Sequence, residues 1–258
     1  FSATFGENGV FVFRSFDNGA TWSRPVVPPL IPPKGRGTVV YADQAFDFSI
    51  IHDKEYIAVD NTGGPHNGRL YVTWTKFEST KQAINMAYSD DNGGTFSDPI
   101  EISGSSSALC PTSFGGYGNT GVCDVDQFSY PTVTPNGALA VVFENFQSLT
   151  AAADFRGQLL VTRVDPDSFA VSAPSKVSAV IDGLDDYPID SDGDQTLCNS
   201  NFRLGASTGN IAVDQNGKLY VTWFDDRAKA GQFPFPTFVA GAPPSSVSGH
   251  VHGRQCLL

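Results

Sequence analysis

The chain has 258 residues, 26 glycines, 17 prolines and a formal net charge of −11. This charge argues against a nucleic-acid partner and against an anionic membrane surface, because both need a basic face. No apolar run reaches the roughly 18 residues of a membrane-spanning helix, so no membrane span is expected. Short apolar runs broken by turn residues, without sustained helical spacing, predict an all-β chain.

The first predicted hairpin turn follows the apolar run 10–13 and has a near copy after the run 84–88. Both copies read Ser-x-Asp-Asn-Gly-x-Thr-aromatic. Asn-Gly tolerates the positive φ that a tight strand-to-strand turn needs, and the Asp carboxylate can accept backbone N–H bonds across the turn. The residues that define the turns are Ser15, Asp17, Gly19, Thr21 and Trp22 in the first copy, and Ser89, Asp91, Gly93, Thr95 and Phe96 in the second.

A second repeated unit is a strand, a glycine turn and a strand that ends in an aromatic residue. It occurs at 57–74, 131–143 and 211–223. Period and turn chemistry both indicate β-hairpins. Its leucines are separated by 69 positions from Leu70 to Leu139 and by 80 from Leu139 to Leu219, and a decayed copy of the first turn is placed near 164–174. Repeats of this size, each with about four strands, fit propeller blades with long loops.

The repeated turn resembles the Asp-box, or BNR repeat, of the sialidase-like β-propellers. The resemblance implies a single all-β domain, a sialidase-like β-propeller with its boxes in outer hairpins, so Asp17 and Asp91 are interpreted as turn-formers rather than catalysts. About three to four blades can be placed, whereas propellers of this family usually close with six. The chain is therefore expected to be a fragment of a larger propeller, or to be completed by self-association or partner chains. The blades are expected at 1–30 (an outer half), 46–103, 128–180 and 205–258 (a degenerate end).

The sialidases of this family bind a sugar carboxylate with three arginines, and they use a Tyr–Glu pair and an Asp acid/base. Their first arginine lies in a Phe/Tyr-Arg-Ile-Pro motif, which this chain lacks. The nearest string contains Arg203, without the proline and late in the chain. Arg227 follows a predicted inner strand, where propeller loops face the central pocket, and is the better candidate for binding. The alternative for Arg227 is an ion pair with Asp225 or Asp226.

Two acidic residues at strand ends are further candidates. Glu144 ends a predicted inner strand, and Asp53 precedes Tyr56 at the entry to a blade. Both could line the mouth of the central channel, and the alternative is a solvated strand end. The candidate substrate-binding residues are thus Arg227, Glu144, Asp53 and Arg203, and no catalytic residue is assigned.

Four cysteines are present. Cys110 and Cys123 bracket a glycine-rich loop and are predicted to form a disulfide, with free thiols as the alternative. Cys198 and Cys256 could form a second pair. Together with the resemblance, the cysteines favour an extracellular or cell-surface location.

An acidic stretch at 182–194 suggests a metal site. Asp190, Asp192 and Asp194 place carboxylates at alternate positions around Gly193. Hard oxygen ligands at that spacing suit calcium, which is the one cofactor that the sequence indicates. The stretch departs from the EF-hand loop, and the alternative is a solvated acidic loop.

Three functions are compatible with this pattern. The first is a secreted or surface Asp-box propeller, related to sialidases, that binds a glycan or glycoprotein and has no identifiable catalytic centre in this chain. The second is an exo-sialidase-type glycoside hydrolase whose catalytic residues lie partly outside this chain. The third is a structural component of an extracellular assembly. A fold does not fix an activity, and the missing Arg-Ile-Pro motif favours the first.

Overall fold

The computed structural model describes residues 8–22, 40–45, 49–113, 116–148, 157–180 and 209–223. These residues form twelve β-strands and no helix, which confirms the prediction of an all-β chain. Consistent with this, the described segments contain no helix able to cross a membrane.

The strands follow one another along the chain as antiparallel neighbours. They are β1 (Asn8–Val12), β2 (Val40–Ala45), β3 (Ile51–Val59), β4 (Leu70–Phe77), β5 (Gln82–Ser89), β6 (Ile100–Glu101), β7 (Asp126–Val133), β8 (Leu139–Asn145), β9 (Gln158–Val164), β10 (Ser175–Ala179), β11 (Gly209–Val213) and β12 (Leu219–Trp223). They form sheet 1 (β1-β2), sheet 2 (β3-β4-β5-β6), sheet 3 (β7-β8-β9-β10) and sheet 4 (β11-β12).

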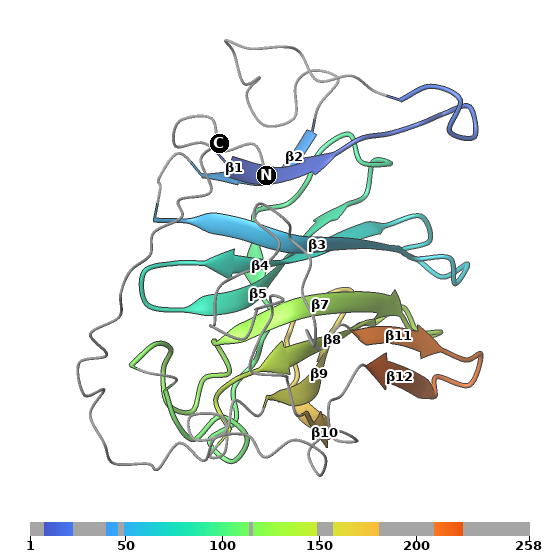
Figure 1. Ribbon diagram of the computed structural model, residues 1–258. Coiled ribbons are helices and arrows are strands. Elements are labelled where there is room, and N and C mark those ends of the chain that lie inside the picture. Colours follow the sequence, from blue (N-terminus) through green and yellow to red (C-terminus); the bar gives the residue numbers. More distant parts are fainter. Residues whose placement is uncertain are drawn as a thin grey trace, which may run out of the picture.

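The four sheets are stacked in chain order, from blue to orange in Figure 1. An apolar core lies between each pair of neighbouring sheets. β8 is sandwiched between two of these cores and all of its residues are buried, which explains why it is an almost unbroken apolar run. The cores include Val12 and Trp74 between sheets 1 and 2, Tyr71 and Leu139 between sheets 2 and 3, and Val142 and Ile211 between sheets 3 and 4.

The sheets can be set beside the expected blades. Sheet 2 spans Ile51–Glu101, inside the expected blade 46–103, and sheet 3 spans Asp126–Ala179, close to 128–180. Sheet 1 reaches beyond the expected segment, because the partner of β1 is β2. The described residues contain four sheets, and closure into a six-bladed propeller stays a prediction.

The two repeated turns have the same internal hydrogen bonds. In each, the serine hydroxyl donates to the aspartate, the glycine N–H donates to the serine hydroxyl, and the threonine N–H and hydroxyl donate to the aspartate. These distances are 2.6–2.8 Å in the turn 15–22 and 2.7–2.9 Å in the turn 89–96. Asn18 and Asn92 have φ of 56° and 59°, the left-handed conformation that asparagine tolerates.

The hydrogen bonds lower the pKa of both turn aspartates to about 2. For Asp17 the largest cause is the bond from the Thr21 hydroxyl. For Asp91 burial is the largest influence and acts to raise the pKa, and the bonds from Thr95 and Ser89 together outweigh it. Both carboxylates are thus held ionised by their own turns.

Candidate functional site

The first strands of sheets 2 and 3 lie side by side (Figure 1), and each has an irregularity at the same place. The pairing register of β3 shifts between Asp53 and Tyr56, and that of β7 shifts between Gln127 and Tyr130. Inside the shifts, Lys54 has φ of 59° and Phe128, a bulky residue, has φ of 58°. Each such residue costs on the order of 1–3 kcal/mol, and strain of this kind concentrates at functional sites.

A pair of tyrosines connects the two strands next to these bulges. The hydroxyls of Tyr56 and Tyr130 are 3.3 Å apart, and the ring centroids are 4.4 Å apart with the planes tilted by 49°. Tyr56 is 40% exposed and Tyr130 only 8%. The Tyr56 ring is therefore partly exposed to solvent, and the Tyr130 ring packs against it on the buried side.

The Tyr130 hydroxyl is held in its neutral form. Burial is the largest cause that raises its pKa, followed by the hydrogen bond and charge of Tyr56, while the backbone of Gly209 acts in the opposite direction. The charge of Glu144 adds to the rise. A phenol in this setting donates or accepts hydrogen bonds at neutral pH and is a poor nucleophile.

Charged groups stand at the same end of β3. The Lys54 ammonium lies 3.7 Å from Asp53 Oδ2 and 5.5 Å from the centroid of the Phe128 ring. About a quarter of each charged side chain is exposed. The predicted binding residue Asp53 thus lies beside the partly exposed Lys54 ammonium, which in turn lies near the Phe128 ring.

Glu144, the other predicted residue of this region, is buried. It lies in β8, with Gln127 of β7 and Leu159 of β9 as its neighbours across the sheet, and it is 1% exposed. A Cβ added to Gly157 would come within 2.2 Å of Glu144 Oε1, so a larger residue there would require the Glu144 side chain to move. Glu144 therefore acts on Tyr130 through its charge and does not face solvent.

The remaining predicted site residues lie outside the described residues. These are Arg203, Arg227, Asp190, Asp192 and Asp194, together with the cysteine pair Cys198 and Cys256. Within the described ranges no group of three or more His, Cys, Asp or Glu side chains is placed to hold a metal ion. Calcium binding by the acidic stretch stays a prediction.

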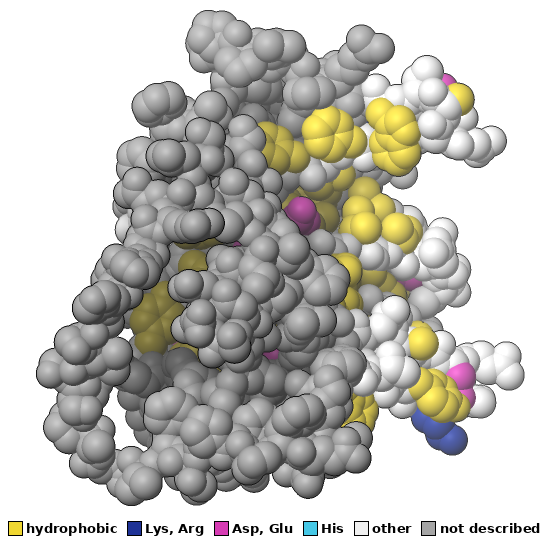
Figure 2. Space-filling view, in the orientation of Figure 1, with side chains coloured by type: hydrophobic (Ala, Val, Ile, Leu, Met, Phe, Trp, Pro, Cys, Tyr) yellow, Lys and Arg dark blue, Asp and Glu magenta, His cyan; other side chains and the backbone are white. Residues whose placement is uncertain are grey.

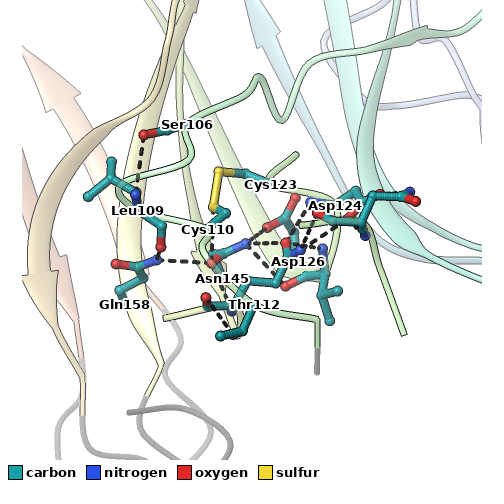
Figure 3. Close-up of a disulfide and its surroundings, with 12 residues drawn as sticks. Ser106, Leu109, Cys110, Thr112, Cys123, Asp124, Asp126, Asn145 and Gln158 are labelled. Atoms are coloured by element: carbon teal, nitrogen blue, oxygen red, sulfur yellow. Dashed lines mark hydrogen bonds between the residues drawn. A yellow bond between two sulfur atoms is a disulfide. The ribbon is translucent and has the colours of Figure 1, made fainter. Parts of the chain in front are cut away.

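The predicted disulfide between Cys110 and Cys123 is present and buried (Figure 3). It closes a loop that lies against the ends of β8 and β9. The Gln158 amide donates to the Leu109 carbonyl at 2.6 Å and to Asn145 Oδ1 at 3.0 Å. The disulfide therefore closes the loop on itself, and hydrogen bonds from Gln158 hold the loop against sheet 3.

Two buried carboxylates beside the disulfide differ in their environment. Asp124 accepts from the Asn119 N–H at 2.8 Å and from the Asn119 amide at 2.6 Å. Asp126 Oδ1 accepts from Asn145 at 2.7 Å, and Oδ2 has no hydrogen-bond partner among the described residues. Burial raises the pKa of Asp126 well above its ordinary value, although hydrogen bonds from Ser103 and Asn145 act the other way.

No protein-family model matches the chain, and no curated protein matches it. Among solved structures, the chain is similar to one titled "Hadza microbial sialidase Hz136", with a TM-score of 0.37 and 16% sequence identity. The match covers 68% of this chain and 35% of that one. At this level the similarity carries no argument about activity.

The tyrosine pair was not among the predicted site residues, although the sequence contains a signal for it. Tyr56 and Tyr130 each come directly before a repeated sequence unit, at 57–74 and 131–143, and the third copy has Asn210 there. Alignment of the repeats would have placed both tyrosines at one position of neighbouring sheets. The bulges that bring them together depend on tertiary packing and have no local sequence signature.

Proposed function

We propose that this chain is part of a sialidase-like Asp-box β-propeller that binds carbohydrate at the Tyr56–Tyr130 site without hydrolysing it. The observation that carries the proposal is an exposed tyrosine ring supported by a buried one. Asp53 and Lys54 stand at the neighbouring bulge. The repeated turns at 15–22 and 89–96 and the stack of antiparallel sheets support the propeller.

The site has the chemistry of a sugar-binding surface. The Tyr56 ring offers a flat apolar face with a polar edge, against which a sugar ring can pack. Asp53 and Lys54 provide an acceptor and a donor for hydroxyl groups. The strained bulges and the contact with Tyr130 hold this face in one orientation, which lowers the entropy lost on binding.

The same geometry argues against hydrolysis by the tyrosine pair. A tyrosine nucleophile has to ionise, and the pKa of Tyr130 is raised by burial and by a neighbouring phenol. Among the described residues, no arginine takes part in the Tyr56–Tyr130 contact. The described residues of this contact therefore offer no bidentate arginine to a sugar carboxylate.

The disulfide supports a proposal about location. A disulfide such as Cys110–Cys123 persists in oxidising compartments and is rare in the cytosol. We therefore place the protein outside the cell or at its surface, where glycans and glycoproteins are its candidate ligands.

Binding to a panel of neutral and acidic oligosaccharides, followed by calorimetry, tests the proposal. Tyr56→Ala should weaken binding by about tenfold, because an aromatic contact is lost. Tyr220→Ala, which removes a tyrosine that is 53% exposed on β12, is the matched control and should bind as the wild type does. Equal binding by both variants, or release of a monosaccharide by the wild type, would contradict the proposal, and release would favour the hydrolase alternative.

A further inference from the structure

Sheets 1 and 4 are two halves of the four-stranded pattern that sheets 2 and 3 share. The repeated turn follows both β1 and β5, so β1 corresponds to the third strand of sheet 2. The repeated hairpin makes β11 and β12 correspond to β3 and β4, the first two strands. Within the described residues, sheet 1 thus contains only third and fourth strands, and sheet 4 only first and second strands.

Sheet 1 leaves exposed the apolar face that a complete sheet buries. Phe11 and Phe13 are 48% and 42% exposed, and they point away from sheet 2, because Val10 and Val12 pack on it. The corresponding residues of sheets 2 and 3 are at most 8% exposed. They are Asn85 and Ala87 in β5, and Leu160 and Thr162 in β9.

Sheet 4 leaves the opposite face exposed. Leu219, Val221 and Trp223 pack toward sheet 3, whereas Tyr220, on the other face, is 53% exposed. The residues that correspond to Tyr220 are Tyr71 at 1% and Ala140 at 0%. Figure 2 shows hydrophobic side chains at the surface over each of the successive sheets.

A cleft lies beside sheet 4, where the described residues contain no counterpart of the turn that follows the third strand. It has a volume of about 350 Å³ and lies between the turns 134–136 and 215–217 and the side chain of Arg163. Among the described residues, the Arg163 guanidinium has no hydrogen-bond or ion-pair partner. Among the described residues that line the cleft, Arg163 is the one with a charged side chain.

One sheet earlier, the corresponding gap is filled. There the turn 165–169, between the third and fourth strands of sheet 3, packs on sheet 2. The Pro166 carbonyl accepts from Arg69 at 2.5 Å, and Phe169 stacks on Tyr88 at 4.4 Å. Tyr88 is one residue before the partner of Leu70 in β5, and Arg163 is one residue before the partner of Leu139 in β9. Arg163 therefore occupies the position of Tyr88 in the next sheet, and the cleft at Arg163 corresponds to the space that this turn fills.

We propose that copies of this chain associate head to tail, with sheet 1 of one copy completing sheet 4 of another. β1 of the second copy adds antiparallel to the edge of β12, which gives the strand order β11-β12-β1-β2. The register follows from the pairing of β4 with β5, in which Leu70 is opposite Ser89. The equivalent register between β12 and β1 places Val221 opposite Phe13 and Trp223 opposite Phe11.

This register buries three exposed aromatic residues of the two half-sheets, which are Phe11, Phe13 and Tyr220. Phe11 and Phe13 of the second copy pack against sheet 3 of the first, and Tyr220 packs against sheet 2 of the second. The turn 15–22 of the second copy, with its backbone carbonyls and exposed aromatic rings, enters the cleft beside Arg163. Strand addition of this kind gains main-chain hydrogen bonds along the whole edge.

The contact joins two different surfaces, so it continues from copy to copy as a ring or an open array. In Figure 1, β1 and β2 lie beside sheet 2, whereas β11 and β12 lie beside sheet 3, so the two half-sheets are apart within one chain. The proposal goes beyond sugar binding and uses none of the residues of the Tyr56–Tyr130 site.

Sedimentation velocity over a range of concentrations is the first test. The wild type should form species larger than one chain as concentration rises. Phe13→Glu should weaken this association by about tenfold or more, because a charge would be buried without a partner. Val177→Glu, at an apolar residue of β10 that is 37% exposed, is the matched control and should leave it unchanged. A wild type that stays monomeric throughout would overturn the proposal.

Disulfide trapping tests the register without relying on a destabilising variant. Under mild oxidation, a mixture of Phe13→Cys chains and Val221→Cys chains should form a cross-linked dimer, identified by peptide mass mapping. Phe13→Cys mixed with Tyr220→Cys should not, since Tyr220 points to the other face of β12. Equal cross-linking in both mixtures would overturn the register. In a chain carrying both Phe13→Cys and Val221→Cys, cross-linking within one monomer would overturn association between copies.

Discussion

Phe96 and Trp22 occupy the same position of the repeated turn and have different surroundings. Phe96 is 7% exposed and packs with Trp74 and other residues in the core between sheets 1 and 2. Trp22 is 59% exposed, and its indole N–H donates to the Gly19 carbonyl at 3.1 Å. The aromatic residue is thus part of a core in one copy and a surface group in the other.

Truncation of these two residues should therefore have unequal effects. Phe96→Ala is expected to lower the free energy of unfolding by about 3 kcal/mol, because it leaves a cavity in a core. Trp22→Ala is expected to lower it by about 0.5 kcal/mol or less, as for other surface substitutions. Urea unfolding followed by circular dichroism measures both. Similar losses for the two variants would contradict the burial argument.

Asp126 is a buried carboxyl whose pKa is raised well above its ordinary value, chiefly by burial. Below about pH 4 both the folded and the unfolded state hold the proton. As pH rises, the unfolded state loses the proton first, so this group makes the free energy of unfolding fall from about pH 4 upward.

Asp126→Asn removes this titration and should make the decline in stability between pH 4 and 7 smaller. Urea unfolding at several pH values measures the decline. Asp98→Asn, at an exposed residue, is the control and should follow the wild type. A decline in Asp126→Asn as steep as in the wild type would show that the buried carboxyl is not its source.

At the scale of elements, the repeated turn is stabilised by its own aspartate. One hydrogen bond joins the side chains of Ser89 and Asp91 to each other, and three join them to Gly93 and Thr95 in the turn 89–96. The turn leads into Phe96, so its geometry sets where a core residue enters sheet 2. The Asp91 carboxylate therefore affects the position of Phe96 in the core as well as the conformation of its own turn.

The pH dependence of this turn has the opposite sign to that of Asp126. The pKa of Asp91 is lowered to about 2, below the value of roughly 3.9 in an unfolded chain. Its contribution is therefore fully present above about pH 4 and is lost as pH falls toward 2. Asp91→Ala should lower the free energy of unfolding by about 1–2 kcal/mol at pH 6, and the difference from the wild type should shrink at pH 3. A difference that stays constant from pH 6 to pH 3 would contradict this account.

Local elements could be predicted from the sequence, and long-range ones could not. The turns at 15–22 and 89–96 and the hairpins around Leu70, Leu139 and Leu219 depend on residues close together in the chain, so their patterns are readable. The pairing of β1 with β2 crosses a long connection, and no local pattern in the sequence indicates it. The bulges at Lys54 and Phe128 arise from packing between sheets and have no local pattern.

The candidate site could be predicted only in part for the same reason. Asp53 was chosen from its place before a strand, and it does lie beside the bulge of β3. Glu144 was chosen in the same way, yet the position of β8 between β7 and β9 buries it. Tyr130 became a candidate only when neighbouring sheets were seen to bring it against Tyr56.

At the scale of the whole molecule, successive sheets of the same design are stacked in chain order, each burying the face of the previous one. The first strands of sheets 2 and 3 lie side by side as a consequence, and the sugar-binding site proposed here is built across them. A binding role needs this stack to hold two tyrosines in register. A hydrolytic role would need, in addition, an ionisable nucleophile and a cluster of cations.

The most direct test is to incubate the protein with a panel of oligosaccharides while following both binding, by tyrosine and tryptophan fluorescence, and products, by mass spectrometry. The account predicts that at least one oligosaccharide binds, that Tyr56→Ala weakens this binding by about tenfold, and that the bound sugar is recovered with its mass unchanged. Release of a terminal monosaccharide by the wild type, or binding that does not depend on Tyr56, would contradict it.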